Sequence, residues 1–204
     1  MTDNGGNPRL VVGMTGATGV IYGIRLLEVL RDQGVVTELI MSDWAEKTIR
    51  IETGYRPEQV REMATVNHPA RNQAASLSSG SYRTDGMVVV PCSMKTLACI
   101  ATGVTQNLIH RAADVVLKEQ KILVLVPRET PFNAIHLQNM LTLSRIGVSI
   151  MPPVPAYYSR PETIDDLINH FVARVLDQFG IETDITNRWR VAPPEGLAGE
   201  QDSG

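Results

Sequence analysis

Two uninterrupted apolar runs most constrain what this chain can fold into. Residues 87–90 read MVVV and residues 122–126 read ILVLV, and a proline follows each run. A strand with one face in water alternates apolar and polar residues, whereas a strand covered on both faces is apolar throughout. The two runs therefore predict central strands of a parallel sheet that has helices packed on both of its faces.

Other strands and helices are expected to alternate around these two runs. Strands are predicted at 10–12, 35–41 and 147–151 from short apolar stretches. Helices are predicted from the apolar spacing over 20–33, 42–51, 93–120, 131–145 and 161–179, with a short helix starting at Pro57. This alternation predicts an α/β fold, a three-layer α/β/α sandwich around a doubly wound, mostly parallel sheet of the Rossmann-like or flavodoxin-like kind.

Length and composition predict one domain. The chain has 204 residues, and neither an internal repeat nor a linker divides it. The polar, Gly- and Pro-rich ends, 1–8 and 191–204, are expected to be disordered or flexible, which leaves a single domain over 9–190.

Charge and cysteine content exclude several classes of protein. A net charge of −3 lacks the broad basic surface of a nucleic-acid-binding protein. Cys92 and Cys99 have the spacing of neither a disulfide framework nor a zinc site, and we expect no metal. No apolar stretch is long enough to cross a membrane. We therefore expect a cytoplasmic protein with no nucleic-acid or membrane partner.

The site is expected where the strands end. In open α/β sheets, ligands bind beyond the carboxyl ends of the strands. Four segments follow a predicted strand directly and carry most of the unusual chemistry of the chain: 13–19, 42–44, 91–96 and 127–132.

The segment 13–19, GMTGATG, opens a helix directly after the first strand. Its glycines permit a tight turn that brings backbone amides close to a phosphate or a flat ring. A nicotinamide dinucleotide is one candidate ligand, with Asp43 as the ribose acid. Against it, Gly23 lies four residues beyond Gly19 rather than three, and no Tyr has a Lys four residues later. A tight turn that binds nothing is the other alternative.

The segment 91–96, PCSMKT, has hydroxyls at a helix start. Ser93 and Thr96 can hold a phosphate there with the charge of Lys95, or Ser93 can simply cap the helix. Cys92 is interpreted as a small buried hydrophobe rather than a nucleophile.

Charged side chains beside apolar segments form a third group: Arg111, Lys118, Arg128, Glu129 and Arg174. Arg111 and Lys118 fall on nearly the same face of one helix. They can gather around an anion, or they can pair with Asp114 and Glu119 on a solvated face.

Five motifs in order carry a resemblance to a known family: GMTGATG, VPCSMKTLA, RAADVVLK, VPRETPF and PPVPAYY. They resemble the UbiX/Pad1 flavin prenyltransferases, and within that family the B subunits of phenolic acid (hydroxyarylic acid) decarboxylases. The resemblance runs from about Arg9 to Trp189.

The resemblance implies an enzyme that joins a dimethylallyl group to N5 and C6 of reduced FMN without a metal ion. The donor would be dimethylallyl monophosphate or diphosphate. The product, prenylated FMN, would pass to a UbiD-type decarboxylase. Family members form large homo-oligomers, commonly dodecamers, so we expect Arg111, Lys118 and Tyr158 to act near neighbouring chains.

The resemblance also implies roles for particular residues. The FMN-binding residues would be Gly16, Ala17, Thr18, Ser42, Ser93, Met94, Lys95, Thr96 and Arg128. The prenyl phosphate would be held by Arg111, Lys118, Tyr158 and Arg174, with Trp189 close by. Glu129 would protonate the departing phosphate and Glu52 would assist proton movement at the flavin. Thr18 stands where many members have Ser, so it keeps the hydroxyl for a catalytic role and adds a methyl group.

Two other functions stay open on the sequence alone. One is an accessory subunit that binds prenylated FMN without making it. The other is an NAD(P)-dependent reductase, suggested by the TGATG signal. A direct decarboxylase is a weaker alternative.

Overall fold

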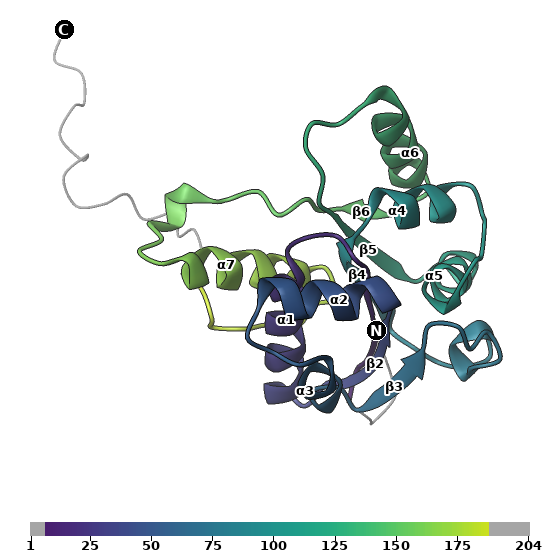
Figure 1. Cartoon of the computed structure of the whole chain (residues 1–204), viewed down its shortest axis with the longest axis horizontal. Coiled ribbons are helices and arrows are strands. Elements are labelled where there is room, and N and C mark those ends of the chain that lie inside the picture. The colour runs from purple at the N-terminus through teal and green to yellow at the C-terminus, as the bar shows by residue number, and fades with distance from the viewer. Residues whose placement is uncertain (1–6, 188–204) are drawn as a thin grey trace, which may run out of the picture.

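A single parallel sheet of six strands forms the centre of the molecule in the computed structural model, which describes residues 7–187 (Figure 1). The strands are β1 (Arg9–Met14), β2 (Val36–Met41), β3 (Val66–Pro69), β4 (Gly86–Cys92), β5 (Ile122–Pro127) and β6 (Ser149–Ile150). Their order across the sheet is β3-β2-β1-β4-β5-β6, and every pair is parallel. This is the doubly wound order of the Rossmann-like folds, so the predicted fold class is confirmed.

Helices cover both faces of the sheet (Figure 1). One face carries α1 (Val20–Asp32), α2 (Asp43–Glu52), α3 (Pro57–Glu62) and α7 (Ile164–Asp177). The other face carries α4 (Met94–Ala101), α5 (Leu108–Lys118) and α6 (Ala134–Arg145). Two short 3₁₀ helices, η1 (Ser76–Ser78) and η2 (Tyr157–Ser159), lie in the connections.

The central strands send alternate side chains into two separate cores. In β4, Val88 and Val90 pack with the α1 and α7 side, whereas Met87 and Val89 pack with the α4 and α5 side. All four side chains are at most 1% exposed. Both faces of the strand are dry, which explains why the run 87–90 contains no polar residue.

The structure differs from the sequence prediction at several element boundaries. Strand β3 was not predicted, because this edge strand is largely exposed and polar and lacks an apolar run. Pro91 does not end β4, which continues to Cys92. Helix α6 begins three residues later than predicted, since the Asn133 side chain accepts a hydrogen bond from the His136 amide and caps the helix.

Several predictions fall on the ends of the chain. Residues 1–6 and 188–204, which include Trp189, lie outside the described residues. Within the described part, no helix has the length and apolar character needed to cross a membrane.

A buried carboxylate joins the polar edge of the sheet to its centre. The side chain of Glu38, on β2, is fully buried. Its carboxylate accepts hydrogen bonds from Tyr82 Oη at 2.6 Å and from Arg9, and it lies 2.6 Å from His68 Nε2 on β3. Burial raises the pKa of Glu38, but the hydrogen bonds from Tyr82, His68 and Arg9 together outweigh it, so the pKa lies below its ordinary value.

We predict that Glu38→Gln lowers the free energy of unfolding by about 3 kcal/mol at pH 7, because Arg9, His68 and Tyr82 lose the buried anion that they contact. A depressed pKa stabilises the fold above the ordinary value of 4.5, and this contribution is lost as the pH falls through the folded-state pKa. Urea unfolding of both proteins between pH 3 and 7 measures the difference, which should shrink at acid pH. Glu62→Gln, at an exposed position, is the control. A difference that stays constant with pH would contradict the role given to the carboxylate.

Candidate functional site

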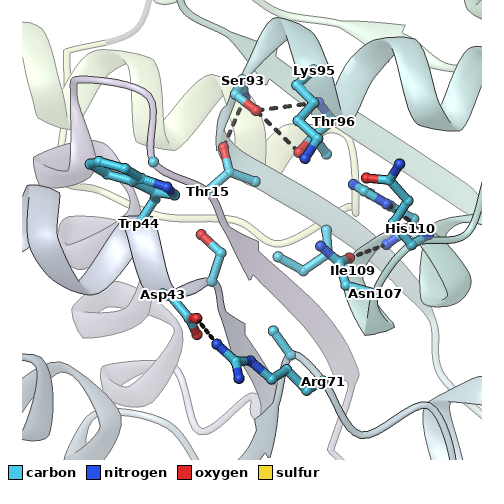
Figure 2. A pocket seen from close by; sticks show the side chains of 14 residues that line it. Thr15, Asp43, Trp44, Arg71, Ser93, Lys95, Thr96, Asn107, Ile109 and His110 are labelled. Atoms are coloured by element: carbon cyan, nitrogen blue, oxygen red, sulfur yellow. Dashed lines mark hydrogen bonds and ion pairs between the residues drawn. The ribbon is translucent and has the colours of Figure 1, made fainter.

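A cavity of about 420 Å³ opens at the carboxyl ends of the strands (Figure 2). Its walls come from the segments after β1, β2, β3 and β4 and from the start of α5. The lining residues are Thr15, Gly16, Ser42, Asp43, Trp44, Ala70, Arg71, Ser93, Lys95, Thr96, Gln106, Asn107, Ile109 and His110. No lining residue lies beyond His110 in the sequence, so the first 110 residues build the whole wall.

The cavity brings together five of the residues that the sequence assigned to FMN: Gly16, Ser42, Ser93, Lys95 and Thr96. Ala17, Thr18, Met94 and Arg128 are not among the lining residues. Sequence reasoning missed Thr15, Trp44, Asn107 and His110. Thr15 and Trp44 stand inside segments that were singled out, whereas no local signal pointed to the start of α5.

Thr15 ties the end of β1 to the end of β4. Its hydroxyl donates to the Pro91 carbonyl at 2.8 Å and accepts from the Ser93 amide at 2.8 Å. The end of β2 is held as well, since the Ser42 amide donates to the Met14 carbonyl at 3.0 Å. Because Thr15 is only 3% exposed, water cannot replace these bonds easily. The loops after three strands are therefore fixed relative to one another.

The start of α4 offers an anion site. The Ser93 hydroxyl accepts from the Thr96 amide at 3.2 Å and lies 3.1 Å from Thr96 Oγ1 (Figure 2). The remaining first-turn amides, the exposed Lys95 and the positive end of the helix dipole all favour a negatively charged group there.

The glycine-rich loop lies directly against α2. A Cβ atom at Gly16 would come within 2.4 Å of Trp44 Cβ and within 3.2 Å of the Trp44 carbonyl carbon. The close approach leaves the Trp44 side chain, which is 65% exposed, as an aromatic wall of the cavity (Figure 2). Only glycine permits this contact at position 16.

The start of α1 is already occupied by an anion from the chain itself. The Glu52 carboxylate accepts hydrogen bonds from the amides of Gly19 at 2.8 Å and Val20 at 3.2 Å. In dinucleotide-binding folds the pyrophosphate lies at this first helix terminus. The glycine-rich loop of this chain is therefore not expected to hold a pyrophosphate at the start of α1.

Charged residues expected around a prenyl phosphate lie outside the cavity wall and pair with neighbours. Arg111 bonds to Asp114 at 2.6 Å and also donates to the Ser78 carbonyl, and Lys118 pairs with Glu119. Within one chain, Arg111 and Lys118 therefore pair with nearby acidic residues, which is the second of the two alternatives that the sequence left open.

Two further predicted residues lie on or near α7. Arg174 bonds to Asp177 at 2.6 Å, and Tyr158 Oη lies 3.0 Å from His170 Nε2. After β5, the Glu129 carboxylate accepts from the Thr130 amide at 3.0 Å, and the Arg128 amide donates to the Cys92 carbonyl at 3.4 Å.

The described residues contain no cluster of three or more His, Cys, Asp or Glu side chains that could hold a metal ion. Cys92 is fully buried, and burial raises the pKa of its thiol well above the ordinary range. It is a buried apolar side chain, as predicted.

Comparisons with known proteins identify relatives of this chain. The family model described as flavoprotein matches residues 1–176. A probable UbiX-like flavin prenyltransferase from Streptomyces sp. (strain D7) is 59% identical over 182 residues, which make up 89% of this chain and 91% of that protein.

Two solved structures are also similar. AnUbiX (PadA1) in complex with FMN and dimethylallyl pyrophosphate is 52% identical, with a TM-score of 0.90 over 92% of this chain and 100% of that one. A dodecameric FMN-dependent UbiX-like decarboxylase from Escherichia coli O157:H7 is 57% identical, with a TM-score of 0.88 over 89% of this chain and 99% of that one. Fold and site thus define a flavoprotein. More narrowly, the chain belongs to the UbiX/Pad1 family of flavin prenyltransferases.

We predict that Gly16→Ala destabilises the protein by about 1–3 kcal/mol, because the new methyl group would overlap Trp44 Cβ, which is fixed to the backbone of α2 and cannot rotate away. Gly54→Ala is the matched control, since a Cβ there meets nothing within 4 Å, and it should change stability by less than about 0.5 kcal/mol. Urea unfolding of the two variants measures both effects. Equal stabilities would show that the loop and α2 can separate freely.

Proposed function

We propose that this protein transfers a dimethylallyl group from dimethylallyl phosphate to N5 and C6 of reduced FMN, and releases prenylated FMN to a UbiD-type phenolic acid decarboxylase. Each subunit contributes one flavoprotein domain, 9–190, and the assembled enzyme acts in the cytoplasm without a metal ion. The observation that carries the proposal is the cavity between the glycine-rich loop, Trp44 and the start of α4.

The residues of the cavity fit FMN. Its volume falls in the range of about 300–1,000 Å³ that suits a ligand of this size. Ser93, Lys95 and Thr96 would hold the phosphate at the start of α4, which Ser93 caps. Gly16 and Trp44 offer a backbone surface and an aromatic surface to the flat ring at the other side of the cavity.

Glu52 argues against the NAD(P)-dependent reductase. A dinucleotide would place its pyrophosphate at the Gly19 and Val20 amides, which the Glu52 carboxylate already holds. A second anion there would meet like charge. A ligand phosphate would therefore bind at the start of α4 and not at the start of α1. One such site is enough for a mononucleotide.

The donor phosphate needs several fixed cations, because cleavage of the allylic C–O bond leaves negative charge on the phosphate. Arg111, Lys118 and Arg174, with the hydroxyl of Tyr158, are the groups proposed for this. In one chain these cations pair with local acids, so we propose that the site is completed between subunits, where they exchange partners. When bound, reduced FMN supplies the nucleophilic atoms and a π surface that supports the developing allylic cation.

Proton transfer is assigned to two carboxyl groups. Glu129, after β5, donates a proton to the departing phosphate oxygen. Glu52 already lies beside the Gly16–Gly19 loop and, with the hydroxyl of Thr18, moves a proton at the flavin. Ala17, Met94 and Arg128 complete the proposed flavin contacts, and Trp189 the prenyl site.

An apolar surface supports assembly into a homododecamer. Ile135, Leu137 and Leu141 on α6 are 45–70% exposed. Clustered apolar side chains of this kind mark an interface. A second copy of this chain is the proposed occupant, since one chain alone does not gather the cations.

The direct test is anaerobic incubation of the purified protein with reduced FMN and dimethylallyl monophosphate or diphosphate. We predict a flavin product heavier by one prenyl unit in mass spectrometry. Binding of finished prenylated FMN with no synthesis from either donor would favour the accessory subunit instead. Absence of any flavin binding would overturn both functions.

Two substitutions should separate the proposed roles. We predict that Glu129→Gln keeps FMN affinity but slows transfer about 100-fold or more, because the proton donor is lost. Arg174→Ala should chiefly raise the KM for the donor, because a cation at the phosphate is lost. Single-turnover rates over a range of donor concentrations distinguish the two effects, and unchanged rates in both variants would refute the assignments.

The double variant Leu137→Asp/Leu141→Asp tests the interface. We predict a smaller assembly in size-exclusion chromatography with light scattering, together with loss of transfer, because buried carboxylates oppose association. FMN affinity should fall much less, since one chain lines the cavity. Ile164→Asp, at an exposed position on α7, is the control. Full transfer by a monomeric variant would contradict a site completed between subunits.

A further inference from the structure

His110 has a buried donor that lacks an acceptor. The residue is 2% exposed and lines the cavity (Figure 2). Its Nε2 atom has no hydrogen-bond partner, and Ser78 Oγ is the one other buried side-chain polar atom of residues 7–187 in this state. Buried polar groups are almost always bonded, so an orphaned one at a cavity wall indicates a ligand.

The contacts of the His110 imidazole show which kind of ligand group Nε2 can bind. The Gln106 amide donates to Nδ1 at 3.3 Å, so Nδ1 is the acceptor and the proton of the neutral ring lies on Nε2. Burial, with a smaller contribution from the charge of Lys95, lowers the pKa of His110 and keeps the ring neutral. What Nε2 lacks is therefore a hydrogen-bond acceptor.

The residues that line the cavity include no unpaired carboxylate that could accept a hydrogen bond from His110 Nε2. Asp43 is the one carboxylate among the lining residues, and it pairs with Arg71. The charged neighbour of His110 is a cation, Lys95, which stands in the first turn of α4 next to Ser93. An anionic oxygen at this place would satisfy the His110 donor, the Lys95 charge and the helix terminus together.

We propose that His110 donates its Nε2–H to a phosphate oxygen of FMN and thereby makes the cavity select FMN over riboflavin. The inference rests on the proposed function, which places FMN in this cavity. It assigns a specificity role to a residue at the start of α5.

The test compares the two flavins, since riboflavin carries the same ring and ribityl chain without the phosphate. Fluorescence-quenching titrations give dissociation constants of oxidised FMN and riboflavin for the wild type, His110→Leu and His110→Gln. We expect His110→Leu to weaken FMN about 10-fold or more and riboflavin less than about 3-fold, because a hydrogen bond to a charged group is lost. His110→Gln, which keeps an N–H donor, should recover part of the FMN affinity.

Thermal unfolding separates this role from a structural one. Without ligand, His110→Leu should melt close to the wild-type temperature, because the loss of the unsatisfied Nε2 donor offsets the loss of the Nδ1 acceptor for the Gln106 amide. Its melting temperature should rise less than that of the wild type when FMN is added. His136→Leu, on α6 and outside the cavity, is the control and should bind FMN like the wild type.

Three outcomes would overturn the inference. They are unchanged FMN affinity in the His110 variants, an equal loss for both flavins, and destabilisation of the ligand-free variant with a normal response to FMN. If His110→Leu does not fold, the flavin ratio of His110→Gln decides in the same way. If the wild type binds neither flavin, the proposed function fails first.

Discussion

One hydroxyl group fixes the geometry on which the site depends. Thr15 Oγ1 bridges the Pro91 carbonyl and the Ser93 amide, so the ends of two central strands cannot separate without leaving buried polar groups unpaired. The glycine-rich loop and the first turn of α4 consequently face the same cavity. A flavin mononucleotide can then meet a backbone surface at one end and a helix terminus at the other.

The starts of α1 and α4 differ in the groups that they can bind. This difference explains how a protein with a Rossmann-like sheet can bind a mononucleotide. The carboxylate of Glu52 neutralises the start of α1, where related folds hold a pyrophosphate. The start of α4 keeps amides, hydroxyls and a lysine for a phosphate. His110 adds a neutral donor at the same end of the cavity. Charge placement, rather than strand order, thus distinguishes this chain from the dinucleotide-binding folds.

Local patterns in the sequence were sufficient to predict five of the six strands of the sheet and part of the cavity. The runs 87–90 and 122–126 predicted buried strands, and the segments after them supplied Ser93, Lys95 and Thr96. The edge strand β3 escaped prediction because its stability comes from pairing with β2 and from the Glu38–His68 contact, which are long-range. His110 escaped for a similar reason: an isolated histidine on a helix reveals neither its burial nor its missing acceptor. The charged residues proposed for the prenyl phosphate stay a prediction, because no single chain gathers them.

The cavity wall ends at His110, whereas Arg111, Lys118, Tyr158, Arg174 and Trp189, the residues proposed for the prenyl phosphate, all follow it in the sequence. The boundary between these two sets has a consequence for how such enzymes can diversify. Arg128 excepted, substitutions in the later half would alter the proposed donor site while the cavity wall built by the earlier half stays unchanged. On the proposed roles, donor choice and flavin retention are therefore traits that selection or engineering can change largely independently.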